Sequence, residues 1–242
     1  MIPDVVDGGG WQSTIVLTNS NTSAASATLI FHSDTTGGGT QVWNPPLLEV
    51  SSTAGLPLTG GSSLFLHTPG TAAALTQGWA ELNADTGVMA YVVFTHRVPG
   101  RPDEDATAPA VPAANRILAP YDDASGFVSA IAFVNPTATA QTITVGFRTV
   151  EGAVALGTLP SIPAQGHIAF LLAQQFPVIA GHRGLAEFYS STGNFSMIAL
   201  RFNATFSSTA SPVFLQSGSP VIPPPSDGGG GYNPYMYRQP RK

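Results

Sequence analysis

The sequence contains no cysteine, and only 10% of its 242 residues are charged. The missing cysteine excludes disulfides, thiolate metal sites and cysteine nucleophiles together, although it does not identify a cellular compartment. Ordinary soluble domains carry about 25% charged residues, so this surface has to be covered mainly by hydroxyl groups and small side chains. Such a surface is common on exported proteins, and we therefore expect an extracellular or cell-surface location.

Basic charge and long apolar runs are also scarce. The formal net charge is −5 and the isoelectric point is near 5.4, whereas a nucleic-acid partner requires a basic stripe. No run approaches the roughly 18 apolar residues of a membrane-spanning helix. The N-terminus also lacks the basic and then apolar order of a signal peptide. We expect neither nucleic-acid binding nor a membrane span, and Met1 is either the native start or the boundary of a processed chain.

The sequence does contain a long internal repeat. Residues 10–19, Gly-Trp-Gln-Ser-Thr-Ile-Val-Leu-Thr-Asn, return 116 residues later as Gly-Phe-Val-Ser-Ala-Ile-Ala-Phe-Val-Asn. The register holds without a gap through Phe31 and Phe147, and seven of these 22 paired positions are identical. A second block, Gly-Trp-Ala-Glu-Leu from residue 78, returns as Gly-Leu-Ala-Glu-Phe from residue 184. The repeat predicts an internal duplication of one β-rich unit.

Alternating apolar and polar residues predict short β-strands throughout both copies. Turn residues separate these stretches, and residues 71–77 and 171–180 allow at most a short helical turn. The fold class is therefore all-β, with two tandem antiparallel β-sandwiches. The strands that this pattern predicts are 11–18, 25–32, 64–67, 79–82, 88–96, 117–120, 127–134, 142–148, 167–172, 185–189, 195–202 and 213–215.

Composition divides the chain into four parts. Residues 1–97 form the first sandwich and residues 117–216 the second. Between them, residues 98–116 contain four prolines and the triplet Asp103-Glu104-Asp105, which predicts a solvated linker with an optional closing strand at Val111. Residues 217–242 form a tail rich in Pro, Gly and Tyr.

The repeated motif resembles a known kind of module. Gly-Trp/Phe-x-Ser-x-Ile-x-Leu/Phe-x-Asn, followed by an Ala/Thr-rich strand, is similar to immunoglobulin-like repeats of bacterial exported and cell-surface proteins. The resemblance covers roughly residues 2–216. It implies immunoglobulin-like sandwiches in an extracellular adhesive or structural setting, and it brings no catalytic residues.

One difference between the copies predicts an interface. The outward face of the first repeated strand is mainly polar in copy one, with Gln12, Thr14 and Thr18, but it is apolar in copy two. A strand that is apolar on both faces is expected to be buried on both. This face either packs on the first sandwich or on a neighbouring subunit, or its small side chains simply tolerate exposure. The residues concerned are Val128, Ala130, Ala132 and Val134.

The tail supplies further interface candidates. Residues 223–231 read Pro-Pro-Pro-Ser-Asp-Gly-Gly-Gly-Gly, a stiff spacer followed by a loose one, and aromatic residues and an arginine come next. We expect such a tail to contact a neighbouring copy. Trp43 lies in an insertion that only the first copy has, beside two prolines. The interface candidates added by these segments are Trp43, Tyr232, Tyr235, Met236 and Tyr237.

Catalytic and metal-binding patterns are not apparent. The five histidines lack metal-site spacing, and no Gly-x-Ser-x-Gly elbow occurs. Glu81 and Glu187 share a repeat position and are predicted to face solvent, where charge discourages pairing between sheet edges. Aspartates before the repeated strands are weak calcium candidates, although a local turn role is favoured. These candidates are Asp4, Asp7, Asp122 and Asp123.

Together these features favour a non-enzymatic extracellular structural protein without a cofactor. We expect it to self-associate as a homo-oligomer or homopolymer, as in a filament or surface layer. The alternative is a carbohydrate- or surface-binding adhesion module of a larger exported protein, for which a glycan is the expected ligand. A hydrolase is the third possibility, and it requires carboxylates or a Ser/His pair to converge in one cleft.

Overall fold

The computed structural model describes residues 1–205 and 207–222. It is nearly all β, which confirms the predicted all-β sandwich fold class. The chain divides into two compact units, unit 1 (Met1–Pro112) and unit 2 (Ala113–Lys242). None of the helices in the described ranges is long and apolar enough to cross a membrane.

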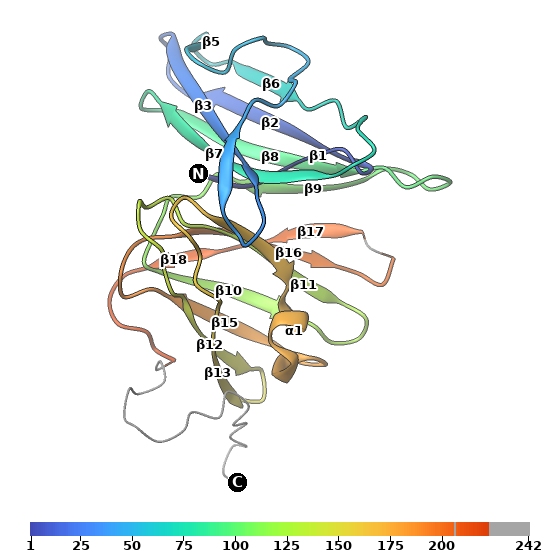
Figure 1. Cartoon of the computed structure of the whole chain (residues 1–242), viewed down its shortest axis with the longest axis vertical. Coiled ribbons are helices and arrows are strands. Elements are labelled where there is room, and N and C mark those ends of the chain that lie inside the picture. Colours follow the sequence, from blue (N-terminus) through green and yellow to red (C-terminus); the bar gives the residue numbers. More distant parts are fainter. Residues whose placement is uncertain (206, 223–242) are drawn as a thin grey trace. The chain divides into compact units, whose positions relative to one another are not determined.

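Unit 1 is built from two antiparallel sheets (Figure 1). One has the order β1-β7-β3-β4, and β5 pairs with the first residues of β3 while β4 pairs with its last residues. The second sheet has the order β6-β2-β8-β9. The buried side chains between them include Ile15, Leu17 and Phe31. The strands of unit 1 are β1 (Ile2–Asp7), β2 (Trp11–Asn19), β3 (Ala25–Asp34), β4 (Thr40–Trp43), β5 (Leu56–Leu58), β6 (Ser63–His67), β7 (Thr76–Ala84), β8 (Val88–His96) and β9 (Glu104–Pro109).

Unit 2 repeats this plan. Its sheets have the orders β13-β12-β15-β10-β18 and β14-β11-β16-β17, and aromatic side chains such as Phe133, Phe147 and Phe188 form its core. Two short helical segments, α1 (Leu172–Gln175) and η1 (Pro177–Ile179), follow β14. The strands of unit 2 are β10 (Arg116–Asp122), β11 (Val128–Val134), β12 (Thr144–Thr149), β13 (Val154–Thr158), β14 (His167–Leu171), β15 (Arg183–Tyr189), β16 (Ser196–Phe202), β17 (Ser208–Ser211) and β18 (Phe214–Gln216).

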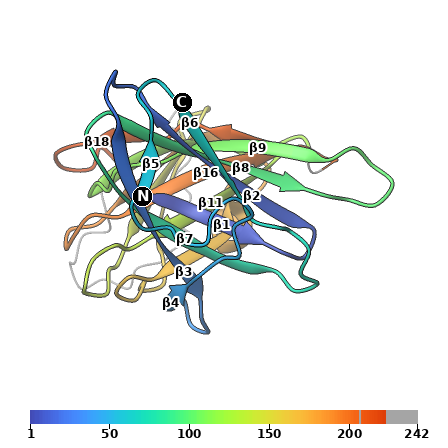
Figure 2. The same ribbon diagram turned by 90° about the horizontal axis from the view of Figure 1, so that it is seen from above.

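The segment 98–116, predicted to be a linker, is largely part of the two units. Strand β9 runs antiparallel beside β8 and closes the sheet of unit 1, as the long β8–β9 ribbon in Figure 2 shows. The optional closing strand thus lies at Glu104–Pro109 rather than at Val111. Ala106 and Ala108 point inward and are buried, and Pro109 is tolerated because β9 is an edge strand. Strand β10 of unit 2 already begins at Arg116.

The repeated glycines allow a close backbone approach. A Cβ atom on Gly78 would lie 1.8 Å from the carbonyl oxygen of His32, and one on Gly184 would lie 2.0 Å from that of Arg148. Each contact joins the corresponding strands of its unit, β7 to β3 and β15 to β12. Because a backbone carbonyl cannot move aside cheaply, only glycine fits these two positions.

The repeated serines connect the two sheets of each unit. The Ser13 hydroxyl accepts from Val6 N–H and donates to Val6 C=O, both at 2.9 Å. The Ser129 hydroxyl accepts from Asp122 N–H at 2.8 Å and donates to Asp122 C=O at 3.2 Å. Both serines are buried, so each satisfies a backbone donor and acceptor that water does not reach.

The repeated asparagines connect a turn to a distant loop. The Asn135 amide donates to the carbonyl oxygens of Thr139, Ile162 and Pro163 at 2.8, 3.1 and 2.8 Å. Its Oδ1 accepts from Thr137 N–H at 3.0 Å. Asn19 makes the equivalent contacts in unit 1, and both side chains are fully buried. The motif therefore consists of residues that the fold of one unit requires.

Candidate functional site

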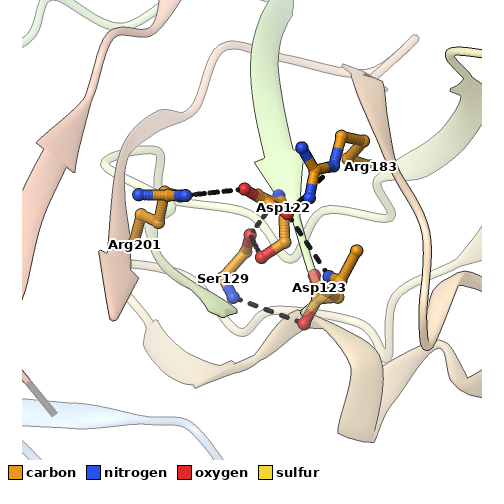
Figure 3. Close-up of polar contacts among 6 residues, drawn as sticks. Asp122, Asp123, Ser129, Arg183 and Arg201 are labelled. Carbon is orange, nitrogen blue, oxygen red and sulfur yellow. Dashed lines mark hydrogen bonds and ion pairs between the residues drawn. The ribbon is translucent and has the colours of Figure 1, made fainter. Parts of the chain in front are cut away.

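A charged cluster of unit 2 surrounds Asp122, at the end of β10 (Figure 3). Arg201 of β16 donates to Asp122 Oδ2 from Nε at 3.0 Å and from Nη2 at 2.8 Å. Arg183 of β15 approaches the other carboxylate oxygen, with Nε 3.5 Å from Oδ1. The carboxylate thus lies between two guanidinium groups that come from different sheets.

Unit 1 has uncharged residues at the equivalent positions. Ser13 pairs across the sheet with Phe94, as Ser129 pairs with Arg201. Val6, which the Ser13 hydroxyl contacts, corresponds in the same way to Asp122. Phe94 and Val6 are both buried. The second copy therefore has an ion pair where the first has two apolar side chains.

Asp123 lies beside this ion pair in a less polar setting. Its Oδ1 accepts from Ser129 N–H at 3.3 Å, whereas its Oδ2 is buried and lacks a hydrogen-bond partner among the described residues. Burial, together with the neighbouring Asp122 charge, raises the pKa of Asp123 to about 6. This carboxyl group therefore changes its charge close to neutral pH.

An open pocket of about 370 Å³ adjoins the cluster. Arg148 and Arg183 supply positive charge to its wall, and Val150, which is 67% exposed, supplies an apolar rim. On the other side of the cluster, the guanidinium carbon of Arg201 lies 3.4 Å from the ring centre of Phe127. The remaining pocket residues are Tyr121, Asp122, Thr149, Gly184 and Leu185.

This arrangement suits anion binding better than hydrolysis. The Asp122 carboxylate is already paired with two arginines, and the Ser129 hydroxyl is bonded to the backbone on both sides. A nucleophile or general base needs a group that is poised toward a substrate. Arg148 and Arg183 line the pocket with guanidinium groups, of which that of Arg183 also approaches Asp122. Guanidinium groups donate hydrogen bonds to carboxylates and sulfates.

The aspartates considered for calcium have protein partners. Asp7 Oδ1 accepts from Gly70 N–H at 2.7 Å, and the Asp4 carboxylate accepts from the Gln77 amide at 3.1 Å. Asp122 and Asp123 are the cluster residues described above. Within residues 1–205 and 207–222, three or more His, Cys, Asp or Glu side chains do not come together in a way that could hold a metal ion.

An apolar row, exposed at Phe65 and Pro109, crosses one sheet of unit 1. Val16 of β2 is flanked across the sheet by Phe65 of β6 and Tyr91 of β8, and Tyr91 is flanked by Pro109 of β9. Partners in an antiparallel ladder point to the same face, so these four side chains form one line. Phe65 is 48% exposed, whereas Val16 between its neighbours is 1% exposed. Met89, one ladder position further on the same face, is 58% exposed.

The predicted interface residues have different environments. In β11, Ala132 and Val134 are buried, whereas Val128 and Ala130 are half-buried. Trp43 is half-buried and packs edge-on against the core residue Phe31, with ring centres 6.1 Å apart. That these residues form an interface stays a prediction. The tail candidates Tyr232, Tyr235, Met236 and Tyr237 lie outside the described residues.

The prediction that Glu187 faces solvent is wrong. Its side chain is 1% exposed and accepts from Arg116 Nε at 2.5 Å. The carboxylate also accepts from the backbone N–H groups of Val221, at 3.0 Å, and Ile222, at 2.5 Å. Glu81, at the equivalent position of unit 1, is partly exposed and lies 3.6 Å from His32 Nε2. The sequence contained no local signal for the Glu187 site because its partners are 34 to 71 residues away.

Comparison with known proteins identifies no relative. No protein-family model, curated protein or solved structure matches the chain.

Proposed function

We propose that this chain is a non-enzymatic extracellular structural protein whose copies associate into a homopolymer such as a filament or surface layer. The observation that carries the proposal is the apolar row of unit 1, of which Phe65 and the adjacent Met89 are exposed. A line of apolar side chains across a whole sheet is typical of a surface that becomes covered by another protein. Self-association covers it without requiring a second kind of molecule.

Composition and resemblance support the extracellular setting. The sparse charge and abundant small residues suit an exported protein, and the repeated motif resembles immunoglobulin-like repeats of bacterial surface proteins. Two antiparallel sheets in each unit are compatible with that resemblance. The sandwiches are accordingly proposed to be immunoglobulin-like.

Light scattering and electron microscopy of the intact chain over a range of concentrations test the proposal. We expect regular polymers, and we expect Phe65→Ser combined with Met89→Ser to weaken association at least tenfold. Val42→Ser is the matched control, because Val42 is 72% exposed in the same unit but lies on the other sheet. A chain that stays monomeric at high concentration contradicts the proposal.

The pocket beside Asp122 favours a second candidate, a surface-binding adhesion module. Arg148 and Arg183 at its wall suit an anionic group such as the carboxylate of an acidic carbohydrate. A glycan array tests this candidate, with Arg148→Ala as the variant that should lose binding. Equal signals for acidic and neutral glycans, or for the variant and the intact protein, count against it.

A further inference from the structure

The last described residues of unit 2 lie on the outer face of its own sheet. After β18, residues 217–222 cross that sheet, and Ile222 is 5% exposed although the preceding Val221 is 71% exposed. Four contacts hold the segment. Glu187 accepts from the N–H groups of Val221 and Ile222, Arg116 donates to Ser217 C=O at 3.1 Å, and Ile222 packs on Gly146.

Gly146 creates the space that Ile222 fills. A Cβ atom at residue 146 would lie 2.2 Å from Ile222 Cγ2, so glycine is required while the segment is in place. The equivalent residue in unit 1 is Ile30, which pairs with Glu81 as Gly146 pairs with Glu187. Ile222 therefore supplies on this sheet an isoleucine side chain that the strand of unit 1 carries itself.

The groove over Gly146 is a built site for an extended peptide. Glu187 offers both carboxylate oxygens to successive backbone N–H groups, and the buried Arg116 balances its charge. Charge-assisted hydrogen bonds of this kind are among the stronger ones. The site thus contacts the backbone of the segment through Glu187 and its apolar side chain through Gly146.

The segment is also arranged so that it can leave. It lies on the C-terminal side of the folded strands, and only residues 212 and 213 separate β17 from β18. These strands belong to different sheets. Three Cα–Cα steps reach at most about 10–11 Å, which is about the distance between two packed sheets. The crossover therefore has little slack, and short hinges favour exchange of the following element between copies.

We propose that residues 214–222 form an exchangeable arm that, in the assembled protein, occupies the Gly146 groove of a second copy. The inference rests on the proposed self-association and names one interface for it. Each copy then donates one arm and offers one groove. A contact of this heterologous kind produces a filament when it does not close.

Complementation between two variants of the full chain tests the exchange. Gly146→Ala blocks the groove but leaves the arm intact, and Ile30 in unit 1 shows that this strand accommodates a side chain here. Ile222→Asp damages the arm but leaves the groove, and Val221→Asp is its matched control because that side chain faces solvent. We expect each of the first two variants alone to lose association at least tenfold, and Val221→Asp to retain it.

Mixing the two defective variants distinguishes exchange from docking within one chain. The intact arm of the Gly146→Ala chain can enter the intact groove of the Ile222→Asp chain, so we expect 1:1 heterodimers in sedimentation velocity. A mixture without heterodimers overturns the exchange. The proposed function survives that result if the intact chain still polymerises, and it fails only if the intact chain is monomeric.

A covalent check does not depend on association strength. The chain has no cysteine, so a Gly146→Cys chain mixed with an Ile222→Cys chain can form only one kind of mixed disulfide. Ile222→Cys removes the Cγ2 atom that a side chain at residue 146 would meet at 2.2 Å, and the two Cβ positions are 2.5 Å apart. A shift of about 1 Å then gives disulfide geometry. Mixed dimers in excess over those of each chain alone support exchange. A chain that carries both Gly146→Cys and Ile222→Cys can also form the disulfide within one molecule. If all of its disulfides are intramolecular, the exchange proposal is overturned.

Discussion

Phe94 and Arg201 occupy equivalent positions in the two units, each opposite the repeated serine of its sandwich. The change from a buried aromatic ring to an arginine is accompanied by the change from Val6 to Asp122. The two changes compensate each other, because the new charges form an ion pair at 2.8 Å. Unit 2 thus has the same strand pairing as unit 1 at these positions, but an ion pair replaces two apolar side chains.

The compensation predicts a strong coupling between Asp122 and Arg201. We expect Arg201→Phe and Asp122→Val alone to destabilise the protein by about 1–3 kcal/mol, because each leaves a poorly paired charge. The double variant restores the apolar pair of unit 1. We expect its free energy of unfolding to lie within about 1 kcal/mol of that of the intact protein. Urea denaturation of all four chains measures the coupling. Additive single effects would show that the two positions do not compensate.

Asp123 predicts a pH-dependent stability. Its pKa is about 6 in the folded protein and 3.8 in the unfolded chain, so the folded state binds the proton more tightly. The stabilising contribution is complete below pH 3.8 and is lost as the pH rises through 6. Asp123→Asn keeps the Oδ1 acceptor without the charge. At pH 8 we expect the free energy of unfolding of Asp123→Asn to exceed that of the intact protein by on the order of 1 kcal/mol, after allowance for solvent screening.

Urea midpoints at pH 5 and pH 8 measure this difference. The exposed Asp103, whose side chain is 55% exposed, provides the control variant Asp103→Asn, for which no gain is expected. An Asp123→Asn gain that is equal at both pH values would refute the elevated pKa.

Asn135 is expected to be among the most sensitive positions of unit 2. Asn135→Ala removes its three hydrogen bonds to carbonyl oxygens, although Ile162 C=O keeps Gln141 N–H and Thr139 C=O keeps the Thr137 hydroxyl. At about 1 kcal/mol for each lost hydrogen bond, we expect a cost on the order of 3 kcal/mol. Asn135→Asp keeps the shape but directs a carboxylate at these carbonyl groups, so we expect it to be less stable at pH 7 than at pH 4. Thermal unfolding at both pH values is the measurement. Asn83→Ala, at an exposed strand position, should change little, and an equally small effect of Asn135→Ala would contradict the assigned role.

The repeated glycines predict a contrast between close approach and backbone strain. Gly184→Ala places a methyl group against the Arg148 carbonyl oxygen and is expected to cost at least about 3 kcal/mol. Gly126 has a φ of 83° and only Ala204 Cβ at 3.5 Å near its Cβ position. Gly126→Ala should therefore cost about 1–2 kcal/mol, from backbone conformation alone. Chemical denaturation separates the two, and similar costs would argue against the close approach.

Most of the fold could be predicted from the sequence because apolar and polar residues alternate along most strands. Ile15 and Leu17 point inward and mark β2, and the same pattern at Ile131 and Phe133 marks β11. The closing strand of segment 98–116 was predicted at Val111 and not at β9, because the acidic residues and Pro109 of β9 resemble a linker. Its inward residues are only alanines, which carry little hydrophobic signal.

The candidate sites could be predicted far less well. The pairing of Asp122 with Arg201 depends on residues 79 positions apart, and the burial of Glu187 depends on Arg116 and on backbone N–H groups near residue 222. Neither set has a local motif. The apolar row was also missed, because Phe65, Val16 and Tyr91 become neighbours only when three separate strands are aligned.

The contacts of the repeated serine and asparagine lie within the unit that contains them. Each copy therefore contains the residues that form its own core and its own buried hydrogen bonds. Duplication of the coding segment adds a complete domain. After duplication, the two copies can differ at positions that the shared fold does not require. The ion pair of Asp122 with Arg201, and Gly146 in place of Ile30, are two such differences between the copies.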